Sequence, residues 1–251
     1  MTATFDELIR LGASADVTGW DFSWLDGHAT EERPPWGYAR QLADRLRTAS
    51  ASLDLQTGGG EVLAQAERYP AVAVATESWP PNVQRATQLL HPRGVVVVAD
   101  PDEPPLPFGD EAFDLVTSRH PATIWWGEIA RVLQHGGRYF AQHVGPASAL
   151  ELIEFFLGPQ PDAWRWRHPD DESAAARAAG LEVVDLRTAT LRIEIFDVAA
   201  VVYLLRKVIW WVPGFTVEKY RDRLRELHDL IQREGTFVAH SSRHLIEARR
   251  P

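Results

Sequence analysis

Short apolar runs alternate with amphipathic segments between residues 37 and 144, and this alternation predicts the architecture. Continuous apolar runs are typical of strands buried on both faces of a parallel sheet, whereas helical periodicity marks the segments that cover such a sheet. The pattern therefore predicts a doubly wound α/β sheet, a fold that binds ligands at the carboxyl ends of its strands. The predicted strands are ASLDLQ (51–56), AVAVAT (71–76), GVVVVAD (94–100), FDLVTS (113–118) and RYFAQHV (138–144).

The segments between these strands predict helices. Proline suits the first turn of a helix and glycine its end, so these residues set several of the boundaries. The predicted helices are WGYARQLADRLRTA (36–49), GEVLAQAERY (60–69), a helix from Pro80 or Pro81 to His91, and TIWWGEIARVLQHGG (123–137), which Gly136 and Gly137 stop.

Outside this core the pattern is less regular. We predict a short helix at 3–12 and an ordered loop at 19–35, and after Val144 a mixture of helices and two strands. The chain is expected to form one domain, with a cap at 1–36, a core at 37–145 and C-terminal additions at 146–251. The predicted C-terminal helices are 147–157, 171–179, 197–209 and 216–234, and the strands are 181–196 and 236–250.

Composition narrows the classes of function. A formal net charge of −9 disfavours nucleic acid as a partner. The absence of cysteine excludes disulfides, thiolate metal ligands and cysteine nucleophiles. The most apolar run, 198–212, contains Arg206 and Lys207 and is too short to span a bilayer, and the N-terminus lacks a signal-peptide pattern. We therefore expect a cytoplasmic protein without a membrane partner.

A glycine-rich turn at LDLQTGGGEVL (53–63) predicts a ligand site. Gly58 and Gly60 let the backbone approach a ligand closely. Glu77 lies 19 residues after Gly58 (77 − 58), where a carboxylate can bind ribose hydroxyls, and Asp100 ends the next strand, where it can accept from an adenine amino group. A third glycine of GxGxxG and the phosphate-loop pattern GxxxxGK[ST] are both absent, which disfavours dinucleotides and ATP hydrolysis.

These motifs together resemble the class I S-adenosylmethionine (SAM)-dependent methyltransferases. The resemblance rests on LDLQTGGGEVL, VATES, VADPDEPPLPFGDEAFDLVTSRH and EIARVLQHGGRYFAQHV, and covers about residues 37–145. It implies a Rossmann-like sheet of seven strands with an antiparallel last strand, SAM as cofactor and S-adenosylhomocysteine (SAH) as product. By resemblance the cofactor-binding residues are Asp54, Gln56, Thr57, Gly58, Gly60, Glu77, Ser78, Asp100, Pro101, Ser118 and Arg119.

Gln56 departs from the family pattern, because the family has a glycine at this position. Its amide either turns aside or bonds to the methionine part of SAM, in which case the cofactor binds, or it fills part of the pocket and weakens methyl transfer. A methyltransferase-like protein that binds SAM or SAH but is altered in catalysis is therefore the alternative to an active enzyme.

Histidines supply the candidate proton acceptors, because a base is needed when the methylated atom carries a proton. His120 follows the fourth strand and is the first candidate, His143 ends the fifth strand and is the second, and His28 is a third. His240 and His244 lie on the last strand and are interpreted as structural. No HExxH or HxH spacing occurs, so we expect no metal site.

Ten tryptophans are many for a chain of this length. Most are expected to pack in the core, but an apolar, aromatic-lined pocket above the strand ends is the functional interpretation. The segments 20–40 and 158–170 are placed to form a lid over it. We therefore expect methylation of a small, apolar or aromatic molecule, with nucleic-acid or protein methylation as the disfavoured alternative.

Overall fold

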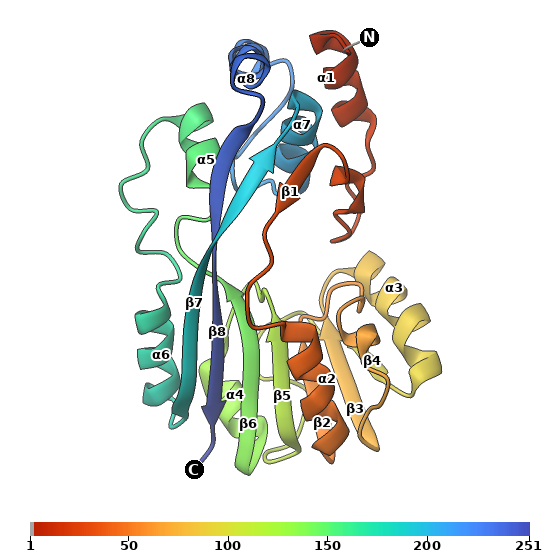
Figure 1. Ribbon diagram of the computed structural model, residues 1–251. Helices are drawn as coiled ribbons and strands as arrows, with labels where there is room; N and C mark the ends of the chain where they lie inside the picture. Colours follow the sequence, from red (N-terminus) through yellow and green to blue (C-terminus); the bar gives the residue numbers. More distant parts are fainter. Residues whose placement is uncertain (1–2) are drawn as a thin grey trace. The chain divides into compact units, whose positions relative to one another are not determined.

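The computed structural model describes residues 3–251, and its strands form one sheet in the order β1-β7-β8-β6-β5-β2-β3-β4 (Figure 1). Strands β2 to β6 pair in parallel, whereas β8 runs antiparallel to β6 and β1 antiparallel to β7. The strands are β1 (Ala29–Glu31), β2 (Ala51–Leu55), β3 (Val72–Glu77), β4 (Val96–Ala99), β5 (Phe113–Arg119), β6 (Leu133–Val144), β7 (Glu182–Ile195) and β8 (Phe237–Arg249).

The doubly wound sheet and its antiparallel last strand are confirmed, with one strand more than the seven expected. The additional strand, β1, lies inside the segment predicted to be a loop. The helices among residues 3–251 are α1 (Phe5–Ser14), α2 (Tyr38–Thr48), α3 (Pro80–Leu90), α4 (Trp126–Val132), α5 (Leu150–Leu157), α6 (Pro169–Ala178), α7 (Val198–Lys207) and α8 (Arg221–Glu234).

The chain divides into two compact units, each built from three segments. Unit 1 contains Met1–Arg33, Pro146–Trp166 and Thr190–Ser242, and unit 2 contains Pro34–Gly145, Arg167–Ala189 and Arg243–Pro251. The sequence prediction of one domain with a cap and additions is not tested by this division and stays a prediction.

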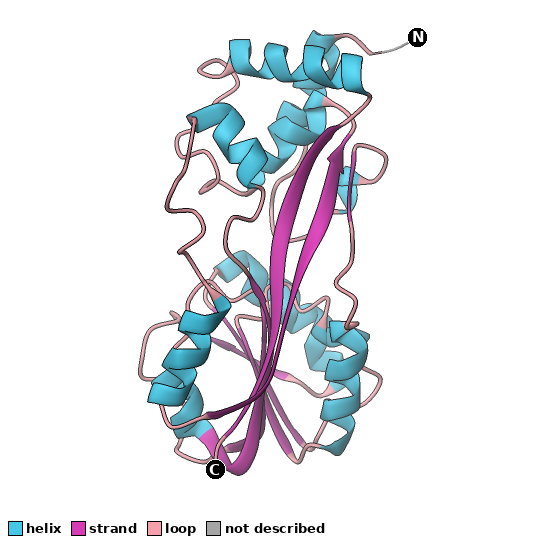
Figure 2. Cartoon of the chain, turned by 60° about the vertical axis from the view of Figure 1, so that its left-hand side comes forward, coloured by secondary structure: helices cyan, strands magenta, loops and turns pink. Residues whose placement is uncertain are grey.

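Unit 2 is a sheet with helices on both faces (Figure 2). One apolar cluster joins α2 and α3 to the first face through Leu42, Leu46 and Leu90. A second cluster joins α4 and α6 to the other face through Ile129 and Ala176. Strand β2 is covered on both faces, since all five of its residues are buried, including the polar Ser52 and Asp54.

Unit 1 packs its helices around α7. Asp197 caps this helix by accepting a hydrogen bond from the backbone N–H of Ala200, and nearly every residue of α7 is buried. Gly12 of α1 lies against it so closely that an added Cβ would be 2.4 Å from the carbonyl oxygen of Ala199. A glycine in the middle of α1 is therefore required by the approach of the two helices.

Two predicted helices are wrong in extent. Residues 60–69 contain only the 3-10 turn η2 (Leu63–Gln65) instead of an α-helix. The segment is short, and Pro70 disfavours helical geometry at the residue before it. The helix predicted at 123–137 ends at Val132, because Leu133 already pairs with Phe113 as the start of β6.

Candidate functional site

Three acids lie side by side at the carboxyl edge of the parallel sheet in unit 2. Asp54 of β2 pairs in register with Ala75 of β3, and Glu77 of β3 pairs with Ala99 of β4. Asp100 follows β4 directly and donates its backbone N–H to the Glu77 carbonyl at 3.0 Å. The expectation that these acids gather at one edge of the sheet agrees with this arrangement, whereas their binding roles stay predictions.

Asp54 is a buried carboxyl at the end of β2. Burial raises its pKa to about 6, and the hydroxyl of Thr117, which donates to it at 2.5 Å, offsets part of that effect. Among residues 3–251 Asp54 forms no ion pair, and a buried carboxylate in this state favours a ligand that carries positive charge. The ammonium group of an amino-acid ligand such as SAM matches this requirement.

Glu77 holds the glycine-rich turn. One of its oxygens accepts from the backbone N–H of Gly58 at 2.8 Å and the other from that of Trp79 at 3.0 Å. Each carboxylate oxygen can accept a further hydrogen bond, so ribose hydroxyls fit beside these contacts. Gly58 has a φ of 64° and lies in the left-handed region that glycine favours.

Gly60 is required by packing. With a φ of 83°, an added Cβ would lie 2.8 Å from Cδ1 of Leu90 in α3. The turn therefore packs directly against α3. It is followed by the 3-10 turn η2 and not by an α-helix, so no α-helix dipole points from this segment to the ligand site.

The turn after β4 carries a second perturbed acid. Asp100 accepts from the backbone N–H of Asp102 at 2.9 Å. Burial raises the pKa of Asp102 to about 6, and the Gln56 amide opposes this rise. Pro101 and Ser78, two further predicted cofactor residues, are exposed at the same edge.

Gln56 spans the carboxyl edge of the sheet. Its Nε2 donates to Asp102 Oδ1 at 2.8 Å and to the Thr123 carbonyl at 2.7 Å, while its Oε1 accepts from the Ala122 N–H at 2.5 Å. Its φ of 54° places a non-glycine residue in the left-handed region, which agrees with the family preference for glycine here. One side chain thus joins β2 to the loops after β4 and β5.

The loop after β5, residues 120–125, is fixed from several sides. The Arg167 guanidinium donates to the carbonyls of Pro121 and Ala122. Trp125 Nε1 donates to the Asp102 carbonyl at 3.0 Å. At the base of the loop, Ser118 is buried and donates to the Leu55 carbonyl, and Arg119 is exposed.

His120 is held in one tautomer by a chain of hydrogen bonds. Trp36 Nε1 donates to Gln142 Oε1 at 2.8 Å, so the Gln142 amide nitrogen faces His120 Nε2 at 2.9 Å. The His120 Nε2 atom therefore accepts, and the ring proton resides on Nδ1. Burial, and next the charge of Arg119, hold the pKa of His120 well below its usual value. A neutral ring suits a proton acceptor, but its Nε2 lone pair is already used.

His143 lies away from solvent and has partners on both nitrogens. Its Nδ1 is 2.5 Å from Glu172 Oε2, and its Nε2 is 3.0 Å from the Tyr139 hydroxyl. These contacts do not favour the prediction that His143 is a base. His28, the third candidate, belongs to unit 1, where its Nδ1 contacts Asp197 at 2.6 Å.

A small cavity of about 10 Å³ lies among these loops. A space of this size holds about one water molecule, whereas ligand pockets measure about 300–1,000 Å³. The lining is mostly apolar, and consists of Leu55, Gln56, Asp102, Leu106, Ser118, Pro121, Thr123, Ile124, Trp125, Ile129 and Tyr139.

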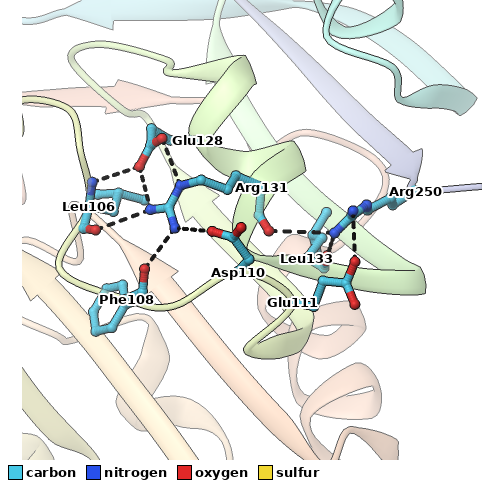
Figure 3. Close-up of polar contacts among 8 residues, drawn as sticks. All are labelled: Leu106, Phe108, Asp110, Glu111, Glu128, Arg131, Leu133 and Arg250. Carbon is cyan, nitrogen blue, oxygen red and sulfur yellow. Dashed lines mark hydrogen bonds and ion pairs between the residues drawn. The ribbon is translucent and has the colours of Figure 1, made fainter.

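Arg131 of α4 anchors the loop between β4 and β5 (Figure 3). Its guanidinium donates to the carbonyls of Leu106 and Phe108 and pairs with Asp110 and Glu128. These contacts fix the LPFGD stretch, residues 106–110. Leu106 also lines the small cavity, so this loop forms part of its wall.

Several residues of the site have no signature in the sequence. Asp102, Gln142 and Arg167 reach it through contacts across 46, 22 and 46 residues respectively. Asp102 was adjacent to the predicted Asp100, and this proximity was the one available signal. The roles of Gln142 and Arg167 follow from tertiary contacts alone.

Comparisons with known proteins agree with this geometry. Residues 53–141 match the model of the methyltransferase domain family. None of the curated proteins compared with this sequence matches it.

Solved structures share the fold at low sequence identity. A protein of Bacillus halodurans C-125 is 19% identical with a TM-score of 0.60, over 85% of this chain and 98% of that one. A SAM-dependent methyltransferase from Thiobacillus denitrificans, in complex with SAH, is 18% identical with a TM-score of 0.51, over 87% and 92%. The [4+2]-cyclase SpnF is 18% identical with a TM-score of 0.53, over 89% and 86%.

The family match over residues 53–141 and the fold shared with these structures are consistent with a class I SAM-dependent methyltransferase. Among residues 3–251, no helix has the length and apolar character that a bilayer crossing needs.

Proposed function

We propose that this protein transfers the methyl group of SAM to a small, apolar or aromatic molecule and releases SAH. The observation that carries the proposal is the placement of Asp54, Glu77 and Asp100 on three adjacent parallel strands within the matched methyltransferase segment. This order of acids fits the ammonium, ribose and adenine groups of one adenosyl ligand.

Two observations support a small, apolar or aromatic substrate: the residues that line the cavity and the net charge of the protein. The cavity beside Gln56 is mostly apolar, and Trp125 and Tyr139 contribute aromatic surface to it. A net charge of −9 opposes a polyanionic substrate such as nucleic acid. The lid predicted from segments 20–40 and 158–170 stays a prediction.

The residues of this chain have distinct tasks in the reaction. SAM, when bound, supplies an electrophilic methyl group on a sulfonium. Asp54 and Glu77 orient the cofactor, and the 120–125 loop excludes water from the transfer path. Methyl transfer itself depends chiefly on the alignment of the two reacting atoms. When the accepting atom carries a proton, His120 receives it after Gln142 releases the Nε2 lone pair.

A second candidate function is favoured by Gln56. Its bonds to Asp102, Ala122 and Thr123 keep the loop against the sheet edge, where a cofactor would lie. If the loop shifts enough to admit the cofactor but still blocks the methyl acceptor, the chain is a methyltransferase-like protein that binds SAM or SAH without methyl transfer.

Isothermal calorimetry with SAM and SAH, followed by an SAH-release assay on small phenols, amines and aromatic acids, tests the proposal. Micromolar binding and SAH release that depends on one of these acceptors are the expected results. Binding without release on any acceptor would favour the second candidate. Absence of binding by both the wild type and Gln56→Gly would overturn both.

A further inference from the structure

Two histidines and a glutamate converge in the interior of unit 2, beyond the predicted cofactor residues. His143 comes from β6, Glu172 from α6 and His244 from β8. One ligand atom from each residue lies within 4.8 Å of the other two. His143 and His244 are 0% and 1% exposed, and Glu172 is 8% exposed.

We propose that the His143–Glu172–His244 cluster is a binding site for a divalent transition metal ion, with zinc as the preferred ion. The inference is independent of the proposed methyl transfer. Two imidazoles and one carboxylate form a donor set that zinc accepts, with a fourth position left for water or another ligand atom.

The geometry supports convergence on one point. His143 Nδ1 lies 2.5 Å and His244 Nε2 lies 2.6 Å from the same oxygen, Glu172 Oε2. Zinc bonds of about 2.0–2.1 Å require ligand atoms about 3.3 Å apart in a tetrahedral site, so each contact has to open by less than about 1 Å. Rotation of the side chains supplies a shift of that size.

The two histidine nitrogens that face Glu172 are the ligand atoms of the proposed site. In the arrangement without an ion, His143 Nδ1 and His244 Nε2 both face Glu172 Oε2 and donate to this carboxylate oxygen. Metal binding therefore requires that each ring proton move to the other nitrogen, so that a lone pair faces the ion.

Neighbouring groups contact the proposed ligands from outside and would orient them toward the ion. The Tyr139 hydroxyl contacts His143 Nε2 at 3.0 Å, the position from which a metal-bound imidazole is oriented. Nδ1 of His244 is buried without a hydrogen-bond partner, so this ring has no other polar task. Arg167 lies 3.8 Å from Glu172 Oε1 and leaves Oε2 to the ion.

The ligands are separated by 29 and 72 residues, which explains why sequence spacing predicted no metal site. Motif spacings such as HExxH describe ligands on one helix. This cluster is assembled from two strands and a helix.

Zinc titration of the chelator-stripped chain, read by a competing chromophoric chelator, tests the proposal. The wild type is expected to bind one zinc ion, and Glu172→Gln to bind at least about 100-fold more weakly, since loss of an outer partner alone costs 10–100-fold. Tyr139→Phe preserves the buried ring and is expected to lose 10–100-fold. His240→Ala removes an exposed histidine paired with Glu151 and serves as the matched control that leaves affinity unchanged.

Two further readouts keep the test decisive. Cobalt bound to the wild type is expected to show the strong visible absorption of a four- or five-coordinate ion, and magnesium, which demands oxygen ligands, is expected not to compete. Absence of zinc binding by the wild type, or equal zinc affinity in the wild type, Glu172→Gln and Tyr139→Phe, would overturn the proposal.

Discussion

The Gln56 side-chain nitrogen donates to Asp102 Oδ1 at 2.8 Å, and this bond joins the end of β2 to the turn after β4. Both residues have positive φ, at 54° and 60°, so the bond links two backbones in an uncommon conformation. Such features concentrate at ligand sites. This contact therefore lies at the edge of the sheet where we propose that the cofactor binds.

Removal of the Gln56 amide is expected to strengthen SAH binding by about 10- to 150-fold. This change corresponds to about 1–3 kcal/mol of binding free energy, because the Gln56 side chain would no longer obstruct the entry of the ligand. Calorimetry of Gln56→Gly measures the effect. Gln65→Ala, which removes an exposed amide from the nearby turn η2, is the control. Equal affinities in all three proteins would show that Gln56 does not obstruct the site.

Asp54 should make stability depend on pH. Because its folded pKa of about 6 lies above the unfolded value of about 3.9, the folded state holds the proton more tightly. Its contribution is full below about pH 4 and is lost as pH rises through about 6, by roughly 2–3 kcal/mol. Urea unfolding of wild type and Asp54→Asn should therefore show that the variant gains relative stability between about pH 4 and 7. A difference that is constant across this range would contradict the raised pKa.

His120 should remain neutral in mildly acidic solution. Burial and the charge of Arg119 hold its pKa well below the usual value of about 6.5, so its NMR ring signals should not shift between about pH 7.5 and 6. Trp36→Phe removes the donor that fixes the Gln142 amide, and the tautomer of His120 should then become mixed. A titration of His120 near its ordinary pKa would disprove this assignment.

Gly60→Ala should destabilise the protein more than Gly94→Ala. Both glycines have nearly the same φ, 83° and 82°, but an added Cβ at Gly60 meets Leu90 at 2.8 Å while that at Gly94 meets nothing within 4 Å. Both variants pay the same backbone cost for a positive φ at alanine. The difference between their losses of unfolding free energy, about 1–3 kcal/mol, therefore measures the overpacking against Leu90. Chemical denaturation of the two variants measures it, and equal losses would mean that Leu90 yields freely.

Local sequence patterns were sufficient to predict the strands of the parallel sheet, because these strands are rich in apolar residues. The strands β2 to β5 are continuous apolar runs, and the acids at their ends followed from the parallel arrangement. The helix expected at 60–69 failed because periodicity does not count the cost of three glycines before it and a proline after it. The extent of α4 was wrong because the pairing of Leu133 with Phe113 is a tertiary contact.

The same distinction applies to the site. Asp54, Glu77 and Asp100 were predictable because each follows an element with a clear pattern. The side-chain path of Gln56 and the pairing of His120 with Gln142 were not, because they depend on how separate loops meet. A departure from a family pattern identifies a position of interest, but only the fold shows what the replacing side chain contacts.

The division of the chain has a consequence for how the protein can be handled. The chain passes between the two units five times, at 33/34, 145/146, 166/167, 189/190 and 242/243. No single truncation therefore yields either unit alone, and a fragment that ends anywhere between these positions leaves both incomplete. Folding of unit 2 must wait for residues 243–251, because they add the last strand segment to its sheet.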